Sequence, residues 1–268
     1  MTIAEKIIRA KEDYDAVHEA GRQEGLDAGG YNKGFEAGKQ DEYDAFWDAA
    51  QQNGTRVKYA LGLCGDMWTK ETFKPKYPII PEGSMANCFA YWGINGVGKD
   101  MDLRELCVLD TSKATNMDSC FFNNKAVIGI GVIDFTQAST MNGTFNGAEN
   151  LITIEKIIMN NGLQKADNLF RNCYALINIS FEGDIMFNID FSACTLLTKT
   201  SIESIVNHLS NDTEGKILTL SKTAVDEAFA FYTEINGEYY VSKGTDEDNP
   251  YWWPLRAKKT NWEIVYSQ

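Results

Sequence analysis

The feature that most constrains this chain is an internal repeat that runs from Val108 to about Thr198. The residues that follow Val108 align with those that follow Val132, and the two segments stay in register at an offset of 24 residues. Each unit carries a phenylalanine that is followed six residues later by an aliphatic residue: Phe121 and Val127, Phe145 and Leu151, Phe170 and Leu176, Phe191 and Leu197. A period in the low twenties predicts stacked coils that bury their apolar residues against one another.

Within each unit, the pattern predicts a strand and a short helical turn. Aliphatic residues alternate in the strand-like segments 127–134, 151–158 and 176–181. The polar segments between them suit a short helix or 3₁₀ turn: 115–122, 140–146 and 165–171. We therefore expect an α/β fold, a short leucine-rich-repeat solenoid over residues 85–198, with a small parallel sheet.

The four repeat phenylalanines should form one buried aromatic column, because stacked units place equivalent residues above one another. Residues 85–106 are expected to form a degenerate first repeat, in which Phe89 and Ile94 stand in for the usual anchors. Residues 55–84 hold three prolines and no steady period, so we expect an irregular cap over the open end of the solenoid.

The first 54 residues read as a helical segment for oligomerisation or attachment. Its first helix has the a/d spacing of a coiled coil, which predicts self-association, most simply as a homotrimer. The positions concerned are Ile3, Ile7, Ala10, Tyr14, Val17 and Gly21. The alternative is an amphipathic helix folded onto its own chain. Glycines at roughly every fourth position over 21–38 predict either close helix contacts or a hinge.

Residues 199–268 are expected to form a small α+β cap. Thr200 and Glu203 have the spacing of a capping box at the start of a helix that would close the solenoid. A second helix is expected over 223–232, and short strands are expected over 217–220, 238–242 and 262–267.

Charge and composition bear on the possible partners. The chain has 25 basic and 38 acidic residues, a net charge of −13, which argues against nucleic acid as a partner. No apolar run reaches the roughly 18 residues of a transmembrane helix, and the start of the chain lacks the apolar centre of a signal peptide. We therefore expect no membrane insertion and no export by that route. The six cysteines show no paired spacing, which favours free thiols made in a reducing cytoplasm.

The sequence predicts no catalytic, cofactor or metal site. Asp110 and Asp134 share a repeat position and could form an acid–base pair, but an Asp followed by Thr or Ser more commonly bonds the next backbone amides and fixes a turn. The glycine-rich run 93–98 lacks a phosphate-binding context and reads as a loop. His18 and His208 suit solvated or interface positions better than metal ligation.

One cluster near the C-terminus is a candidate for ligand contact. Tyr251, Trp252 and Trp253 could stack on a sugar, although paired tryptophans more often form the core of a small β cap. The acidic loop 246–249, from Asp246 to Asn249, offers oxygens for Ca²⁺, but its spacing matches no EF-hand.

The run Asp110-Thr-Ser-Lys-Ala-Thr-Asn-Met117, followed by Phe121 and an aliphatic strand, resembles the BspA-like class of leucine-rich repeats over roughly residues 85–200. The third unit departs from the pattern, because Met159-Asn160-Asn161 replaces Asp-Thr-Ser. The flanks, with Tyr43 to Gly54 before the repeats and Leu196 to Ile202 after them, are similar to a layout of prophage and phage structural proteins of gut Firmicutes. That resemblance implies a tail or fibre-associated protein and supplies no catalytic residues.

The leading hypothesis is therefore a non-enzymatic virion protein, made in the host bacterial cytoplasm. Its N-terminal helices would join it to itself and to other tail proteins, and its repeat body would bind a glycan or protein on the host surface. A bacterial cell-surface adhesin of the same repeat class is the alternative. A tail-associated enzyme that degrades polysaccharide is a second alternative, and it would need an acidic pair in a groove.

Overall fold

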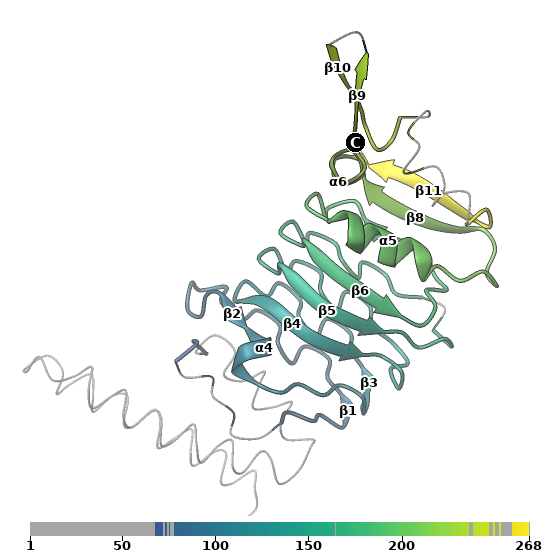
Figure 1. Ribbon diagram of the computed structural model, residues 1–268. Coiled ribbons are helices and arrows are strands. Elements are labelled where there is room, and N and C mark those ends of the chain that lie inside the picture. The colour runs from purple at the N-terminus through teal and green to yellow at the C-terminus, as the bar shows by residue number, and fades with distance from the viewer. Residues whose placement is uncertain are drawn as a thin grey trace, which may run out of the picture. The chain divides into compact units, whose positions relative to one another are not determined.

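The structure is a computed structural model of the 268-residue chain (Figure 1). It describes residues 68–71, 73, 75, 78–163, 165–235, 238–246, 249, 252 and 259–267. The chain divides into two compact units, Met1–Asp48 and Ala49–Gln268, and the whole first unit lies outside the described residues. The predicted coiled coil of Ile3, Ile7, Ala10, Tyr14, Val17 and Gly21 therefore stays a prediction.

The repeat region is a strand-rich stack of coils built around a four-stranded parallel sheet. The sheet holds β2 (Met101–Asp102), β4 (Val127–Asp134), β5 (Thr153–Ile158) and β6 (Asn178–Glu182), in that order (Figure 1). Ile130 pairs with Ile154, which pairs with Ile179, so the strand register follows the sequence repeat. The expected solenoid and its parallel sheet are confirmed at this level.

Strands outside the main sheet come from the corners and the C-terminal end of the stack. β1 (Gly83–Ser84) pairs in parallel with β3 (Ala114–Asn116). β7 (Ile189–Phe191), β8 (Lys216–Ser221) and β11 (Trp262–Ser267) form a second parallel sheet in the order β11-β8-β7. β9 (Phe231–Ile235) and β10 (Glu238–Ser242) form an antiparallel hairpin.

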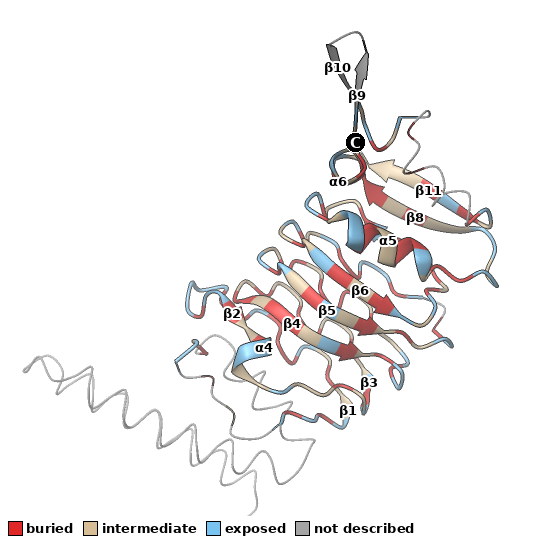
Figure 2. Cartoon of the chain, in the orientation of Figure 1, coloured by how far each residue is buried: buried red, intermediate tan, exposed pale blue. Residues whose placement is uncertain are grey.

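Helices are few and short in the described chain. They are α4 (Leu103–Leu106), α5 (Lys199–Asn207) and α6 (Lys222–Ala228). The expected α/β body is therefore mainly β in the part that the structure describes. Buried and less buried residues alternate along β6 (Figure 2), because successive side chains of a strand point to opposite faces. In β5 the buried residues Ile154 and Ile157 are three positions apart, at a shift of register.

A column of stacked phenylalanines runs through the coils and confirms the expected aromatic core. Phe89, Phe121, Phe145, Phe170 and Phe191 are each at most 1% exposed. Neighbouring ring centroids lie 4.6, 5.5, 5.5 and 4.6 Å apart along this phenylalanine column. The rings of each pair are nearly parallel, as expected when equivalent residues of successive coils stack. Phe89 thus belongs to the first coil, as predicted.

The segments expected to be short helices are instead turns that bond to the next coil. The Ser119 amide donates to the Asn142 carbonyl at 2.8 Å, and the Gly143 amide donates to the Asp167 carbonyl at 2.8 Å. Ser119 has φ = 54° and Asn123 has φ = 50°, and their equivalents in the coils of Phe89, Phe145 and Phe170 are also left-handed. The prediction of helical turns was wrong, because the neighbouring coil, rather than the turn itself, supplies many of the backbone partners.

Three further expectations need correction. Ile94 is 50% exposed, and Met101, which pairs with Val127, is the buried residue that enters the sheet in the first coil. The N-cap of α5 is Thr198, whose hydroxyl accepts from the Ser201 amide, so Thr200 lies inside the helix. The helix expected over 223–232 ends at Ala228, and the chain turns into β9 three residues later.

Candidate binding surface

The outward side of the parallel sheet is the candidate binding surface. We call it the sheet face, and its members are Val132, Glu155, Lys156, Asn178 and Glu182. Val132, Asn178 and Glu182 each adjoin an inward residue of their strand, Ile133, Ile179 or Phe181. Glu155 and Lys156 both lie between the inward Ile154 and Ile157 of β5, where the register between β5 and β6 shifts. The sheet face is polar and carries both signs of charge, with Val132, 43% exposed, as its apolar member.

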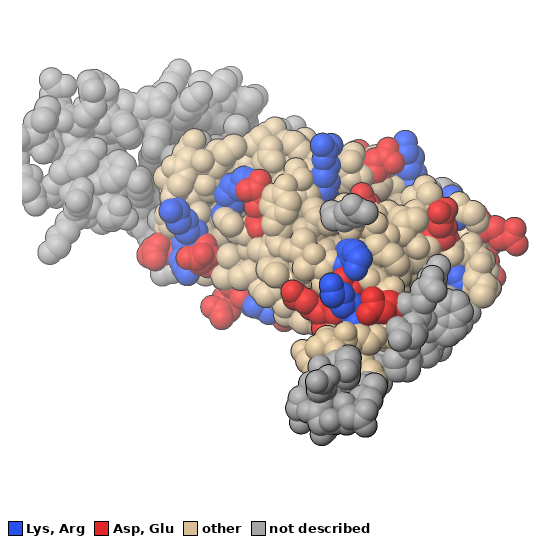
Figure 3. All heavy atoms as spheres, turned by 90° about the horizontal axis from the view of Figure 1, so that it is seen from above, with Lys and Arg blue, Asp and Glu red and all other residues tan. Residues whose placement is uncertain are grey.

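Ion pairs tie the charged side chains of the sheet face to neighbouring coils. Lys156 Nζ lies 2.9 Å from Glu182 Oε2 on the next strand. Arg104, which enters from α4, lies 3.7 Å from Glu155 Oε1. Positive and negative side chains are likewise interspersed on the side of the molecule seen in Figure 3. Exposed pairs of this kind contribute little to the stability of the fold.

A glycine in β4 lets α4 lie close against the sheet. A Cβ built on Gly129 would lie 2.4 Å from a carboxylate oxygen of Asp102, so any other residue at this position would displace the Asp102 side chain. Asp102 is the N-cap of α4 and accepts from the Arg104 side chain at 2.8 Å. The Arg104 hydrogen bond is also the main cause that lowers the pKa of the Asp102 carboxyl, which stays ionised at neutral pH.

Helix α5 closes the other edge of the sheet through two serine hydroxyls. Ser201 Oγ accepts from the Ile179 amide at 3.0 Å, and Ser204 Oγ accepts from the Phe181 amide at 3.0 Å. Ser201 Oγ also donates to the Ile177 carbonyl at 3.1 Å. The serine hydroxyls of α5 therefore bond the backbone groups along the edge of β6 that a further coil would otherwise pair with. The sheet face ends at β6 for this reason.

The two repeat aspartates weighed as an acid–base pair each fix a turn. Asp110 Oδ1 accepts from the Ser112 amide at 2.9 Å, and Asp134 Oδ1 accepts from the Thr136 amide at 2.7 Å. The hydrogen bonds from Ser112 lower the pKa of the Asp110 carboxyl, which is opposite to the shift that a general acid needs. Their role as turn residues, which the sequence favoured, is confirmed.

Trp252, the described member of the C-terminal aromatic cluster, is buried. It is 3% exposed, its ring lies 4.9 Å from that of Phe229, and its indole nitrogen donates to the Tyr266 hydroxyl. Neither face of this indole is open to a sugar. Tyr251 and Trp253 lie outside the described residues, so stacking on a sugar by those two side chains stays a prediction.

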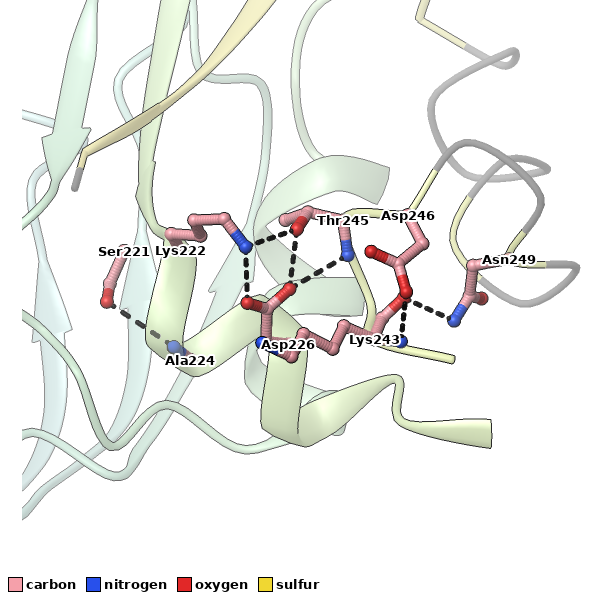
Figure 4. A network of polar contacts seen from close by, with 8 residues as sticks. All are labelled: Ser221, Lys222, Ala224, Asp226, Lys243, Thr245, Asp246 and Asn249. Atoms are coloured by element: carbon pink, nitrogen blue, oxygen red, sulfur yellow. Dashed lines mark hydrogen bonds and ion pairs between the residues drawn. The ribbon is translucent and has the colours of Figure 1, made fainter. Parts of the chain in front are cut away.

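The loop expected to offer oxygens to Ca²⁺ uses its described polar groups internally. Asp246 Oδ2 accepts from the Lys243 amide at 2.6 Å, and Asn249 Nδ2 donates to the Lys243 carbonyl at 2.9 Å. Next to it, Asp226 of α6 binds Lys222 and both the amide and the hydroxyl of Thr245 (Figure 4). The loop is thus held to the end of α6. Residues 247 and 248 lie outside the description.

The two histidines and the glycine-rich run were the remaining candidates from the sequence. His208 is the C-cap of α5, with Nδ1 2.8 Å from the Ser204 carbonyl, and His18 is not described. The run 93–98 is a loop, as predicted, in which Gly93, Gly96 and Gly98 all have positive φ. Within the described residues, no group of three His, Cys, Asp or Glu side chains could hold a metal ion.

The sequence interpretation missed a structural position three residues after Phe121, Phe170 and Phe191 of the column. Asn124 Nδ2 donates to the Phe89 carbonyl at 2.7 Å, Cys173 Sγ donates to the Phe145 carbonyl at 3.1 Å, and Cys194 Sγ reaches the Phe170 carbonyl at 3.9 Å. Each side chain thus bonds the phenylalanine of the coil before its own. The sequence carries this signal as Asn or Cys three residues after Phe121, Phe170 and Phe191, whereas Ala148 stands at that distance from Phe145.

No helix among the described residues has the length and apolar character needed to cross a bilayer. Comparisons of the chain with protein-family models, with curated proteins and with solved structures find no match.

Proposed function

We propose that this chain is a non-enzymatic recognition protein, with a BspA-like leucine-rich-repeat body that presents the sheet face to a partner. In this proposal it is a tail- or fibre-associated protein of a phage or prophage, and its partner is a glycan or protein on the host surface. The sequence resemblance of the repeats and flanks to such proteins supports this assignment. Residues 1–54 would form a homotrimer and attach it to other virion proteins.

The observation that carries the proposal is the difference between the two sides of the sheet. Inward positions repeat from coil to coil, as Ile130, Ile154 and Ile179 illustrate, because each must pack against the next. Outward positions do not repeat: Val132 pairs with Lys156. A face that is free of the packing constraint, and that lies on a stable stack, suits recognition by varied polar side chains.

Binding to cells tests the proposal. The labelled full-length chain should sediment with cells of the species whose phages or prophages carry it, and not with unrelated bacteria. Absence of binding to any cell surface under conditions in which the chain is folded would contradict a role in host recognition.

Assembly is tested separately by size-exclusion chromatography with light scattering. The full chain should have the mass of a trimer, and a chain without residues 1–50 should have the mass of a monomer. A monomeric full chain would remove the proposed role of the N-terminal segment. Release of reducing ends from host polysaccharide would instead support the enzyme alternative.

A further inference from the structure

The loop that follows α5 is bonded closely to the residues that lead into β11. Asn261 Nδ2 donates to the Ser210 carbonyl at 3.1 Å and to the Asn211 carbonyl at 3.3 Å. The Trp262 indole nitrogen donates to the Ser210 carbonyl at 2.8 Å. The two segments are distant in sequence, so these hydrogen bonds fix how their side chains face each other.

Lys259 brings a buried amine into this contact. The residue is 7% exposed, and its Nζ donates to the Leu209 carbonyl at 2.5 Å and to Asn211 Oδ1 at 2.9 Å. None of the ion pairs among the described residues includes Lys259. Burying an ammonium group without a carboxylate in contact is costly, so a change that makes this nitrogen neutral is favoured.

The surroundings of Lys259 favour its nucleophilic form. Burial lowers the pKa of its amine, and the charge of Asp184 acts in the opposite direction. Asp184 precedes Ile185, whose amide donates to the His208 carbonyl at 2.7 Å. The Ile185 carbonyl accepts from the Ser210 amide at 2.9 Å, so Asp184 belongs to the segment beside this loop. More of the amine is neutral than for a lysine in water, and a neutral, desolvated amine is a nucleophile.

The Asn211 carboxamide has two differently held ends. Its oxygen accepts from Lys259, whereas its nitrogen makes no hydrogen bond with any described residue, and Asn211 as a whole is exposed. A carboxamide nitrogen that no neighbour holds can leave into water as ammonia. A C=O bond is about 1.2 Å long, so Cγ lies within about 4 Å of the Lys259 nitrogen, and a rotation of the carboxamide brings it to attack distance.

We propose that Lys259 and Asn211 form an intramolecular isopeptide bond. The Lys259 Nζ attacks Asn211 Cγ, an Nζ–Cγ amide bond forms, and the Cγ–Nδ2 bond breaks. Asp184 takes the proton that Nζ loses and returns it to Nδ2, which leaves as ammonia, so no oxidant or other reactant is needed.

The product removes the buried charge and keeps the local bonding. The new amide is neutral, and its remaining N–H still donates to the Leu209 carbonyl. The bond ties the start of β11 covalently to the loop after α5, so it locks the C-terminal cap to the stack. This site is separate from the sheet face and does not depend on the function proposed for it.

Mass spectrometry of the intact full-length chain tests the proposal. The wild-type chain should be about 17 Da lighter than its sequence requires, which is the mass of one ammonia. Lys259→Met removes the amine and Asn211→Ala removes the carboxamide, so each variant should have its full mass. Because Asn211 is exposed, its truncation should leave the fold intact, which circular dichroism checks. Asp184→Ala should leave a larger fraction of the chain at full mass.

Two controls separate this bond from other losses of ammonia. A succinimide at an Asn-Gly pair, such as Asn142-Gly143, would also lower the mass, but it would persist in the Lys259→Met variant. Lys156→Met replaces an exposed lysine of the sheet face, and this variant should keep the mass loss. Trypsin digestion and tandem mass spectrometry should then find a branched peptide that joins Asn211 to Lys259.

The opposite results are equally definite. A folded wild-type chain that keeps its full mass after prolonged incubation at mildly alkaline pH would overturn the proposal and leave Lys259 as a hydrogen-bonded latch. A mass loss that persists in both Lys259→Met and Asn211→Ala would also overturn it. Equal conversion of wild type and Asp184→Ala would overturn the proton transfer assigned to Asp184.

Discussion

Truncating the central phenylalanine of the column is the perturbation for which the structure gives the clearest magnitude. Phe145 is 0% exposed, and its ring is stacked on both faces, 5.5 Å from Phe121 and 5.5 Å from Phe170. Replacing a buried Phe by Ala typically costs about 3 to 5 kcal/mol, through lost burial and the cavity left behind. Aromatic pairs add about 0.5 to 1.5 kcal/mol each. The measured cost of truncation already includes such pairs, and Phe145 has two of them, so we expect Phe145→Ala to lose about 4 to 5 kcal/mol, near the upper end of that range.

Urea unfolding followed by circular dichroism measures this loss as a lower midpoint. Because a whole domain is stable by only about 5 to 15 kcal/mol, the variant should be close to unfolding at 37 °C. Tyr174→Ala is the matched control, since its ring is exposed, and its effect should stay within about 0.5 kcal/mol. A loss below about 1 kcal/mol for Phe145→Ala would refute the claim that the coils are held together by a tightly packed phenylalanine column.

Four other changes have defined expectations. Asn124→Ala should cost about 2 to 3 kcal/mol in urea unfolding, because it leaves two buried amide donors and one carbonyl without their partner, and a neutral result would contradict that bonding. Gly98→Ala should lower the melting temperature more than Gly96→Ala: both glycines have positive φ, but only a Cβ at 98 meets a backbone oxygen, at 2.1 Å. The hydrogen bond from Arg104 lowers the pKa of Asp102 in the folded state, so the stability that it adds is present above the ordinary pKa of 3.8 and is lost as the pH falls through the folded-state pKa. The difference in free energy of unfolding between wild type and Asp102→Asn should therefore shrink below about pH 4, and a difference that did not shrink would be inconsistent with this. Burial raises the pKa of Cys173 to about 12, so mass spectrometry should find that thiol unlabelled by a thiol reagent at pH 8 in the folded chain and labelled in urea.

The interior of the stack was predictable because its signal repeats. A phenylalanine recurs with each coil, and equivalent residues stack, so Phe121 and Phe145 could be placed in one column from spacing alone. The strand over Val127–Asp134 followed from the same alternation. The repeat period in the sequence and the burial of the phenylalanines in the structure have the same cause, which is close packing between neighbouring coils.

The turns were not predictable in the same way, because their hydrogen-bond partners are distant in sequence. A polar segment such as 115–122 has the composition of a helical turn, yet the Ser119 amide bonds a carbonyl of the next coil. The start of α5 was misplaced for a related reason. Thr198 and Thr200 are both acceptable caps, and the Thr198 amide is held by the Ile177 carbonyl of the preceding coil, at 3.1 Å.

The candidate binding surface gave no periodic signal at all. Outward positions on neighbouring strands differ in character, as Val132 and Lys156 do, because no neighbour restricts them. The ion pair between Lys156 and Glu182 joins residues 26 positions apart, and nothing local in the sequence marks it. Exposed side chains of this kind can be assigned to a common face only after the register of the sheet is known.

The most direct test of the central claim exchanges the charges of one ion pair on the sheet face. Lys156→Glu with Glu182→Lys keeps the pair, the net charge and the fold, and reverses the pattern that a partner would meet. The matched control is Lys113→Glu with Glu82→Lys, an exposed pair at 2.8 Å that links the β1 and β3 corner instead. Binding of the labelled chain to host cells should fall at least about tenfold for the sheet-face exchange and stay unchanged for the control. Equal binding by wild type and both exchanged variants would contradict recognition through the sheet face.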